Sequence, residues 1–153
     1  MANVSSASSS SWRRAIDLSW ADRFLLAEAF ARLGVVRLMV VALPFRVIAK
    51  RLGELQTETP RDDDPSTFDK VRRVRWAILA ASRRAPWRCK CLEHGIAAKL
   101  MLQARGIPST LYLGVARGEG IEAHAWLRCG SHFVSGGDGA NRFSIVSKFG
   151  ARR

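Results

Sequence analysis

The apolar positions of the chain recur at helical spacing through its first two thirds and alternate with polar positions in the last third. Between residues 66 and 85 the spacing of three and four predicts one amphipathic helix, and Ser66 with Asp69 resembles a capping box at its start. Between residues 111 and 146 the alternation predicts short strands. We therefore expect one globular unit with a helical N-terminal part.

Two apolar segments precede this amphipathic helix. Asp22 can cap a first helix that runs towards Leu33, and Gly34 is expected to end it. The second segment, residues 35–52, contains Pro44, so we expect one kinked helix or two short helices there. Both segments are expected to pack against the rest of the domain.

A polar stretch and a Ser-rich start complete the organisation of the chain. Residues 54–65 contain two prolines and the acidic run 62–64 without periodicity, which predicts a solvated linker. The Ser-rich start has no apolar segment of the signal-peptide kind. We expect a disordered Ser-rich lead (1–17), N-terminal helices with the polar linker (18–65) and a core (66–153).

The last third predicts a small sheet. Its expected strands are 111–115, 122–129, 132–135 and a short one around 143–146. Gly130 and Ser131 predict a two-residue hairpin turn. Alternation along the second strand places His124, Trp126 and Arg128 on one face, and small or apolar residues on the other.

The residues with the clearest chemical potential are Cys91 and His124. Cys91 opens a predicted helix that ends at Gly106, and a helix N-terminus favours the thiolate because its N–H groups and dipole stabilise negative charge. A neighbouring imidazole would supply the base. Either residue alone is more often structural, so the prediction depends on both together. Glu93 and His94 on the same helix are expected to face solvent.

Charge and cysteine usage limit the other possibilities. The 153 residues carry 25 basic and 13 acidic side chains, a net charge of +12 that would attract acidic surfaces. The excess is spread along the chain, and aromatic residues do not alternate with basic ones, so nucleic-acid binding is not favoured. Three cysteines without a secretory signal predict reduced thiols in the cytoplasm.

Neither a metal site nor a membrane-spanning helix is expected. The spacing Cys89, Cys91, His94 matches no common zinc pattern, and Cys129 and His132 lie on separate predicted strands. Charged residues and a proline interrupt the apolar region before residue 50, which argues against a helix that crosses a bilayer. A helix lying on a membrane surface stays open, because basic residues flank the apolar face.

The motifs, taken in order, resemble the transglutaminase-like cysteine peptidases of lasso-peptide biosynthesis. The residues that carry the resemblance are Cys91-Leu92, Ala97 to Leu102, Arg105 to Ile107, Leu113 to Val115 and Ala123 to Leu127. The similarity is strongest from Trp87 to Phe149. It implies an α+β fold with a transglutaminase/papain-like core, in which a nucleophile helix packs on a small antiparallel sheet preceded by N-terminal helices.

The resemblance also implies the roles of the site residues. Cys91 would be the nucleophile and His124 the base, and the family's third member is an acidic residue after the histidine strand that orients the imidazole. Here the hairpin register predicts that Gly136 or Gly137 faces His124, and the nearest carboxylate is Asp138. Either a bulge brings Asp138 to the imidazole, or a backbone carbonyl holds the tautomer of a dyad. Trp126 is expected to wall the substrate cleft or to pack beside it.

The implied function is a cytoplasmic cysteine endopeptidase that removes the leader from a lasso-peptide precursor, without a cofactor. The expected partners are the precursor peptide, a separate leader-recognition protein and the ATP-dependent lasso cyclase, because the chain has no room for a recognition domain of its own. Two alternatives stay open. The same residues could transfer the acyl group to an amine, or the fold could serve as a binding module that holds a peptide or a membrane.

Overall fold

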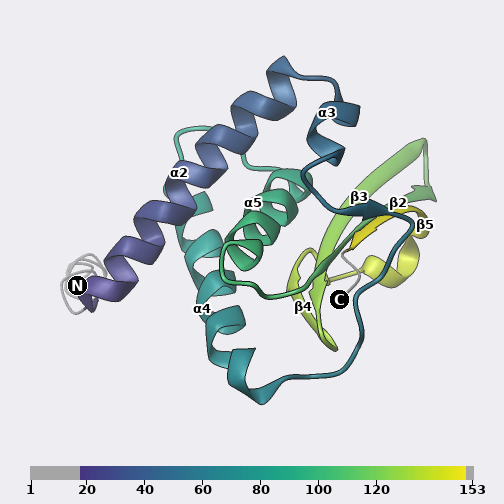
Figure 1. Ribbon diagram of the computed structural model, residues 1–153. Helices are drawn as coiled ribbons and strands as arrows, with labels where there is room; N and C mark the ends of the chain where they lie inside the picture. The colour runs from purple at the N-terminus through teal and green to yellow at the C-terminus, as the bar shows by residue number, and fades with distance from the viewer. Residues whose placement is uncertain (1–17, 151–153) are drawn as a thin grey trace, which may run out of the picture.

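The structure is a computed structural model that describes residues 18–150, so the predicted lead of residues 1–17 lies outside the described residues. The helices are α2 (Trp20–Ala42), α3 (Phe45–Ala49), α4 (Pro65–Ser82) and α5 (Cys91–Gln103) (Figure 1). The strands are β1 (Glu54–Leu55), β2 (Thr110–Arg117), β3 (Ile121–Cys129), β4 (His132–Ser135) and β5 (Ser144–Gly150), and the short 3-10 helix η1 (Ala140–Arg142) precedes β5. Helices followed by an antiparallel sheet make this an α+β domain, as the sequence predicts.

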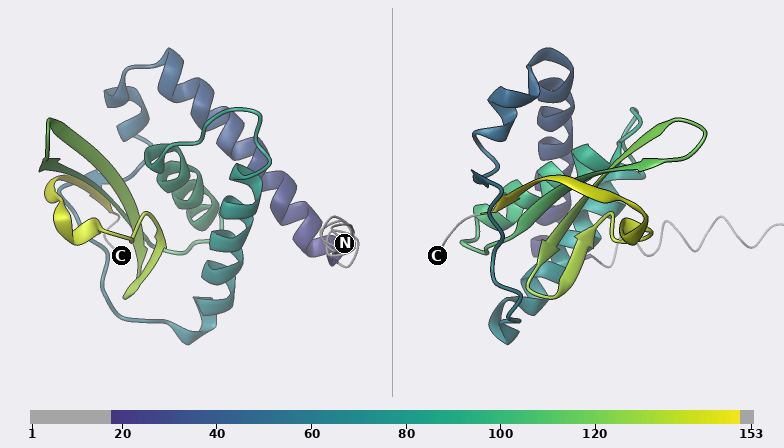
Figure 2. Two further views of the ribbon diagram at one scale, coloured as in Figure 1. Left: turned by 180° about the vertical axis from the view of Figure 1, so that it is seen from behind. Right: turned by 90° about the vertical axis from the view of Figure 1, so that its right-hand side faces the viewer.

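The strands of the described residues form one antiparallel sheet in the order β1-β5-β2-β3-β4. The helices gather on one side of this sheet (Figures 1 and 2). α5 packs directly on it, and Gly95 allows the close approach, because a Cβ there would lie 2.6 Å from a methyl carbon of Leu111. The sequence-predicted hairpin turn is confirmed, with Gly130 at φ +55° between β3 and β4.

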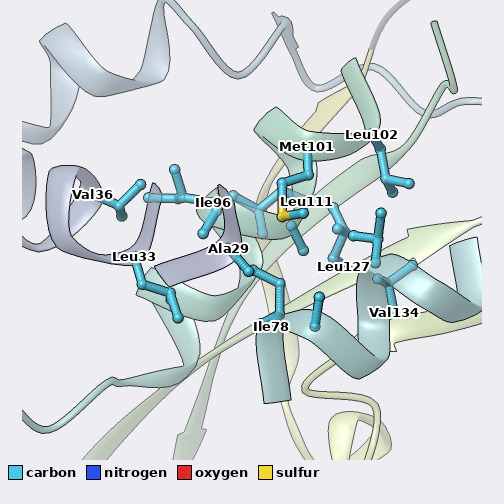
Figure 3. Packing of buried hydrophobic residues seen from close by; sticks show 14 of the residues in the cluster. Ala29, Leu33, Val36, Ile78, Ile96, Met101, Leu102, Leu111, Leu127 and Val134 are labelled. Carbon is cyan, nitrogen blue, oxygen red and sulfur yellow. The ribbon is translucent and has the colours of Figure 1, made fainter. Parts of the chain in front are cut away.

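Each face of the sheet carries its own apolar cluster. The larger cluster joins the sheet to the helices (Figure 3), and its labelled members are Ala29, Leu33, Val36, Ile78, Ile96, Met101, Leu102, Leu111, Leu127 and Val134. The smaller cluster lies on the opposite face and consists of Tyr112, Trp126 and Ala140, with Phe143 packed against them. The helix face therefore holds the main core, while the far face holds a compact aromatic group.

The prediction that the first helix ends at Gly34 is wrong. α2 begins after Ser19, whose hydroxyl accepts the N–H of Asp22 at 3.1 Å, and it continues through Gly34 to Ala42. Leu33 and Val36 on either side are fully buried against the other helices. A glycine inside a helix costs only about 1 kcal/mol, so packing on both sides of it keeps the helix continuous. Pro44 then separates α2 from α3.

The predicted capping box of α4 is also wrong. Asp64 is the capping residue, and its carboxylate accepts the N–H of Ser66 at 2.9 Å. Pro65 occupies the first helical position, where the missing N–H is not needed. Asp69, expected to close the box, pairs with Arg72 on the helix surface instead. The stripe predicted for this helix is largely buried, at Val71, Val74, Ile78 and Ala81.

The segment between α3 and α4 is bound to the sheet, and the prediction of a merely solvated linker is wrong. β1 pairs with β5, and Thr59 is buried with its N–H donated to the hydroxyl of Thr110 at 2.9 Å. Asp63 accepts hydrogen bonds from the backbone and the hydroxyl of Ser131. Because polar residues show no hydrophobic periodicity, the pattern of apolar positions could not predict these specific contacts.

Lys99 on α5 is almost fully buried and is expected to lower the stability of the fold at neutral pH. Its ammonium donates to the carbonyl of Ser109 at 2.5 Å, and burial lowers the pKa of Lys99 to about 8. The unfolded chain binds this proton up to its ordinary pKa of 10.5, so the cost is fully present below pH 8 and disappears as the pH rises towards 10.5.

Replacing Lys99 by methionine should therefore raise the free energy of unfolding at pH 7 by about 1–3 kcal/mol. This gain is the relieved cost of desolvating the ammonium minus the contribution of the hydrogen bond that is lost. The gain over the natural chain should shrink between pH 8 and 10. Urea unfolding across this range measures it, with the exposed Lys50→Met as the matched control. A Lys99→Met chain less stable than the natural one at pH 7 contradicts the expectation.

Candidate active site

Cys91 is the first residue of α5, as the sequence predicts. Lys90 before it has extended backbone angles and forms the helix cap. The thiol of Cys91 is partly exposed, and it makes no hydrogen bond within residues 18–150. The first-turn N–H groups of a helix have no intrahelical partner, so a helix start offers donors that can stabilise an oxyanion. The position suits a nucleophile whose own N–H can bind the carbonyl oxygen under attack.

A buried carboxylate paired with a partly exposed arginine fixes the start of α5. Glu93 is only 1% exposed, and its carboxylate accepts the Lys90 N–H at 3.1 Å and a hydrogen bond from Arg37 of α2 at 2.8 Å. The prediction that Glu93 faces solvent is wrong. Its position three residues after the cap is the usual place for a capping carboxylate, so this signal was present in the sequence. The pair links the N-terminal helix to the end of α5 that carries Cys91.

The other thiols are unsuited to nucleophilic attack. Burial raises the pKa of Cys89, and the nearby charge of Glu93 raises it further. Burial likewise raises the pKa of Cys129. A thiol with a raised pKa stays protonated and reacts slowly. His94 is half-buried with Nε2 unpaired, and burial lowers its pKa, so it is a neutral group beside the helix start.

The Arg37–Glu93 pair leads to a testable expectation. Replacing Arg37 by methionine leaves a buried carboxylate without its cation and should lower the free energy of unfolding by about 1–3 kcal/mol, given that Arg37 is partly exposed. Adding Glu93→Gln should restore much of the loss, because the unpaired charge is gone. Denaturant unfolding measures both, and Arg46→Met on α3 is the control. Equal losses of unfolding free energy in the single and double variants would exclude a stabilising role of the Arg37–Glu93 pair.

His124 is held by the backbone of the glycine loop after β4. Its Nε2–H donates to the carbonyl oxygen of Gly136 at 2.7 Å. A carbonyl can only accept, so the proton resides on Nε2 and Nδ1 is left as the acceptor nitrogen. That is the tautomer a base requires. The hairpin register predicts Gly136 or Gly137 opposite His124, and the structure brings Gly136 there.

Two glycines make this arrangement possible. Gly136 has φ +65°, and a Cβ there would lie 2.3 Å from the carbonyl oxygen of Ala125. Gly114 pairs with His124 across β2 and β3, and a Cβ there would lie 2.8 Å from the indole of Trp126. The loop at Gly136 and the indole of Trp126 can therefore pack this closely around the imidazole only because positions 136 and 114 have no side chain.

Trp126 lies behind His124 rather than at the surface. Its indole is 5% exposed and stacks on Tyr112 with ring centroids 5.5 Å apart. The ring of His124 lies 5.9 Å from it and 4.9 Å from the ring of Phe143. The sequence-predicted face of His124 and Trp126 is thus present, but Trp126 supports the imidazole and offers little surface to a substrate.

Asp138, the candidate orienting residue, is exposed in the loop before η1 and makes no hydrogen bond or ion pair to His124 in the part of the chain that the structure describes. The Gly136 carbonyl occupies the position at Nε2 that an orienting carboxylate would need. A backbone carbonyl holds the tautomer but carries no full negative charge. The carbonyl therefore orients the imidazole, but it stabilises the imidazolium less than an aspartate does.

Cys91 and His124 belong to elements that lie on opposite faces of the sheet. α5 packs on the Leu111 and Leu127 face, while His124 lies with the aromatic cluster on the other. β4 ends at Ser135, which pairs with Leu127, so within the described residues no strand covers that edge of β3 beside His124. No hydrogen bond joins the two side chains here. Catalytic hydrogen bonds are often long or poorly aligned in the absence of substrate.

A cavity lies away from these two residues. It has a volume of about 320 Å³ between the start of α4 and the β3–β4 turn, and its walls include Phe68, Cys129 and His132. Neither Cys91 nor His124 lines it. No group of three or more histidine, cysteine or acidic residues able to hold a metal ion occurs among residues 18–150.

A family model described as the transglutaminase-like superfamily matches residues 39–148, well over half of the chain. This protein belongs to the transglutaminase-like superfamily. The matched region begins inside α2, ends inside β5 and includes Cys91, His124 and Gly136. Comparison with curated proteins and with solved structures finds no match. The predicted α+β transglutaminase-like core is thereby confirmed, and a superfamily of this kind carries cysteine peptidase and acyl-transfer chemistry.

Proposed function

We propose that this superfamily member is a cytoplasmic cysteine endopeptidase that removes the leader peptide from a lasso-peptide precursor. The observation that carries the proposal is the hydrogen bond from His124 Nε2 to the Gly136 carbonyl, which leaves Nδ1 as the acceptor nitrogen that would act as the base. Cys91 at the start of α5 would supply the nucleophile. The motif order from Cys91 to Leu127 supports the lasso-peptide pathway.

The proposed reaction uses the chain's own residues throughout. Nδ1 of His124 takes the thiol proton while Cys91 Sγ attacks the carbonyl carbon at the leader–core junction, and the Cys91 N–H binds the developing oxyanion. The C–N bond then breaks, and the imidazolium returns its proton to the leaving amine. Water, deprotonated by Nδ1, attacks the thioester, releases the leader as a carboxylic acid and restores the thiol.

The proposed pathway includes two partner proteins. A separate leader-recognition protein presents the precursor, and an ATP-dependent lasso cyclase uses the amine that the cleavage frees. The positive charge of this chain favours encounter with acidic surfaces of such partners or of the leader.

The proposal is tested with the precursor peptide from the same gene neighbourhood, incubated with this protein and the leader-recognition protein and then weighed by mass spectrometry. Hydrolysis adds one water and gives two peptides with free termini. An adduct of the precursor with an added amine would assign acyl transfer instead. An unchanged precursor, with its recognition protein present, would reject both.

A further inference from the structure

The outward face of α2 is apolar along its whole length. This α2 stripe consists of residues spaced three or four apart, namely Trp20, Phe24, Ala27, Ala31, Val35, Leu38 and Val41. Trp20, Phe24, Leu38 and Val41 are 75%, 73%, 70% and 70% exposed. At 1.5 Å per residue the helix is roughly 35 Å long. α2 lies along the outer edge of the molecule, and no other described element covers this face (Figures 1 and 2).

α2 has a buried face in addition to the exposed stripe. Ala29, Leu33 and Val36 lie on the opposite side of α2 and are completely buried in the main cluster. The apolar surface continues past the end of α2, where Phe45 and Val47 of α3 are also exposed. Isolated exposed apolar residues are common, but a continuous row of this length marks an interaction surface.

The charges around the stripe favour a negatively charged partner. Residues 20–51 contain six basic and two acidic side chains. Both carboxylates are paired with arginines: Asp22 with Arg73 of α4, and Glu28 with Arg105 after α5. Beyond the stripe, α3 and its end add the exposed cations Arg46 and Lys50. Two of the six cations are also paired, Arg32 with Glu28 and Arg37 with Glu93. The surface thus presents apolar side chains with exposed cations beyond the end of α2 and with its own carboxylates neutralised.

We propose that the α2 stripe binds the surface of a membrane that contains anionic lipids. Trp and Phe inserted at the headgroup level, with Lys and Arg at the flanks, are the usual composition of an interfacial helix. Between Phe24 and Val41 the stripe carries no polar side chain, whereas protein interfaces hold about one hydrogen bond per 100–200 Å². A second copy of this chain would bring two strongly positive surfaces together, which opposes self-association.

The geometry requires α2 to lie in the plane of the membrane. Its other side packs against α4 and α5, so only the stripe can enter the headgroup region. Within the described residues no helix is long and apolar enough to cross a bilayer. Attachment therefore comes from shallow burial of the aromatic and aliphatic side chains together with attraction of the flanking cations. It would hold the folded domain at the surface and be reversible.

The inference is independent of the proposed peptidase activity, because its test measures vesicle binding alone. The purified full chain is sedimented with vesicles of phosphatidylcholine and with vesicles of an equimolar mixture of phosphatidylcholine and phosphatidylglycerol. Binding is expected for the mixed vesicles, to weaken at high salt, and to fall about fivefold for each cation removed in Arg46→Gln and Lys50→Gln.

The decisive variants are Phe24→Glu/Leu38→Glu on the stripe and Ile121→Glu/Ile145→Glu as the matched control. The control residues are exposed apolar side chains on the sheet, 83% and 51% accessible, and carry the same change in charge. The stripe variant should lose at least about tenfold in vesicle affinity, and the control variant should lose only the small electrostatic part. Circular dichroism checks that both variants fold.

Three results would overturn the proposal. The first is a natural chain that does not sediment with mixed vesicles. The second is an equal loss in the stripe and control variants, which would show attraction by net charge alone. The third is a natural chain that is dimeric by light scattering and becomes monomeric in the stripe variant, which would assign the stripe to a second copy.

Discussion

Replacing Cys91 by alanine should abolish cleavage of the precursor, with a rate loss of roughly a thousandfold or more. The reason is that the proposed bond-making atom is its sulfur, and no other group near the start of α5 can replace it. The loss is measured by mass spectrometry of the precursor assay with the recognition protein present. The fold should be unaffected, because the side chain is partly exposed and makes no hydrogen bond among residues 18–150.

Cys89→Ala is the matched control for this variant. It lies two residues before Cys91, just ahead of α5, and its replacement also removes a thiol, but burial and the charge of Glu93 raise the pKa of Cys89. It should therefore keep nearly full activity. His124→Ala should lose about as much as Cys91→Ala, and the double variant should be no worse than either, because a nucleophile and its base act as a unit. A Cys91→Ala chain that still cleaves would contradict the mechanism.

Gly136→Ala should lower both stability and activity. A Cβ at this position would lie 2.3 Å from the Ala125 carbonyl oxygen and would stand on a backbone with φ +65°. The loop must move to relieve the contact, and it carries away the carbonyl that holds His124 Nε2. We expect a loss of about 2–3 kcal/mol in unfolding free energy and about a hundredfold in cleavage rate.

Gly106→Ala provides the matched control. Gly106 has nearly the same backbone angle, φ +67°, but nothing lies within 4 Å of a Cβ built there, and it follows the far end of α5. It should lose about 1 kcal/mol of stability and none of the activity. Unfolding and cleavage are compared for both variants. A Gly136→Ala chain that behaves like Gly106→Ala would show that the carbonyl does not position the imidazole.

The elements that local pattern alone determines were predictable from the sequence. α5, its start at Cys91 and the left-handed Gly106 after its end follow from apolar spacing and a glycine signal. The β3 alternation and the turn at Gly130 follow from period-two patterning and turn chemistry. Combining turn and register also located the glycines opposite His124. These predictions agree with the fold because the interactions that form each feature involve residues close together in the sequence.

The features that depend on distant residues were not predictable in the same way. α2 continues through Gly34 because other helices bury its neighbours, and Asp64 replaces Ser66 as the cap of α4. The Arg37 partner of Glu93 comes from a helix more than fifty residues earlier. Most important, spacing gave no information on how α5 docks against β3. The sequence therefore could not show that Cys91 and His124 belong to elements on opposite faces of the sheet.

The most direct test of the central claim, that Cys91 and His124 act as one unit, is the rate at which iodoacetamide alkylates each cysteine at pH 6, followed by mass spectrometry. The account predicts that Cys91 reacts first and that His124→Gln slows it about tenfold or more, while Cys89 and Cys129 are unchanged. A Cys91 that reacts no faster than Cys89, or whose rate is the same in His124→Gln, would contradict the account.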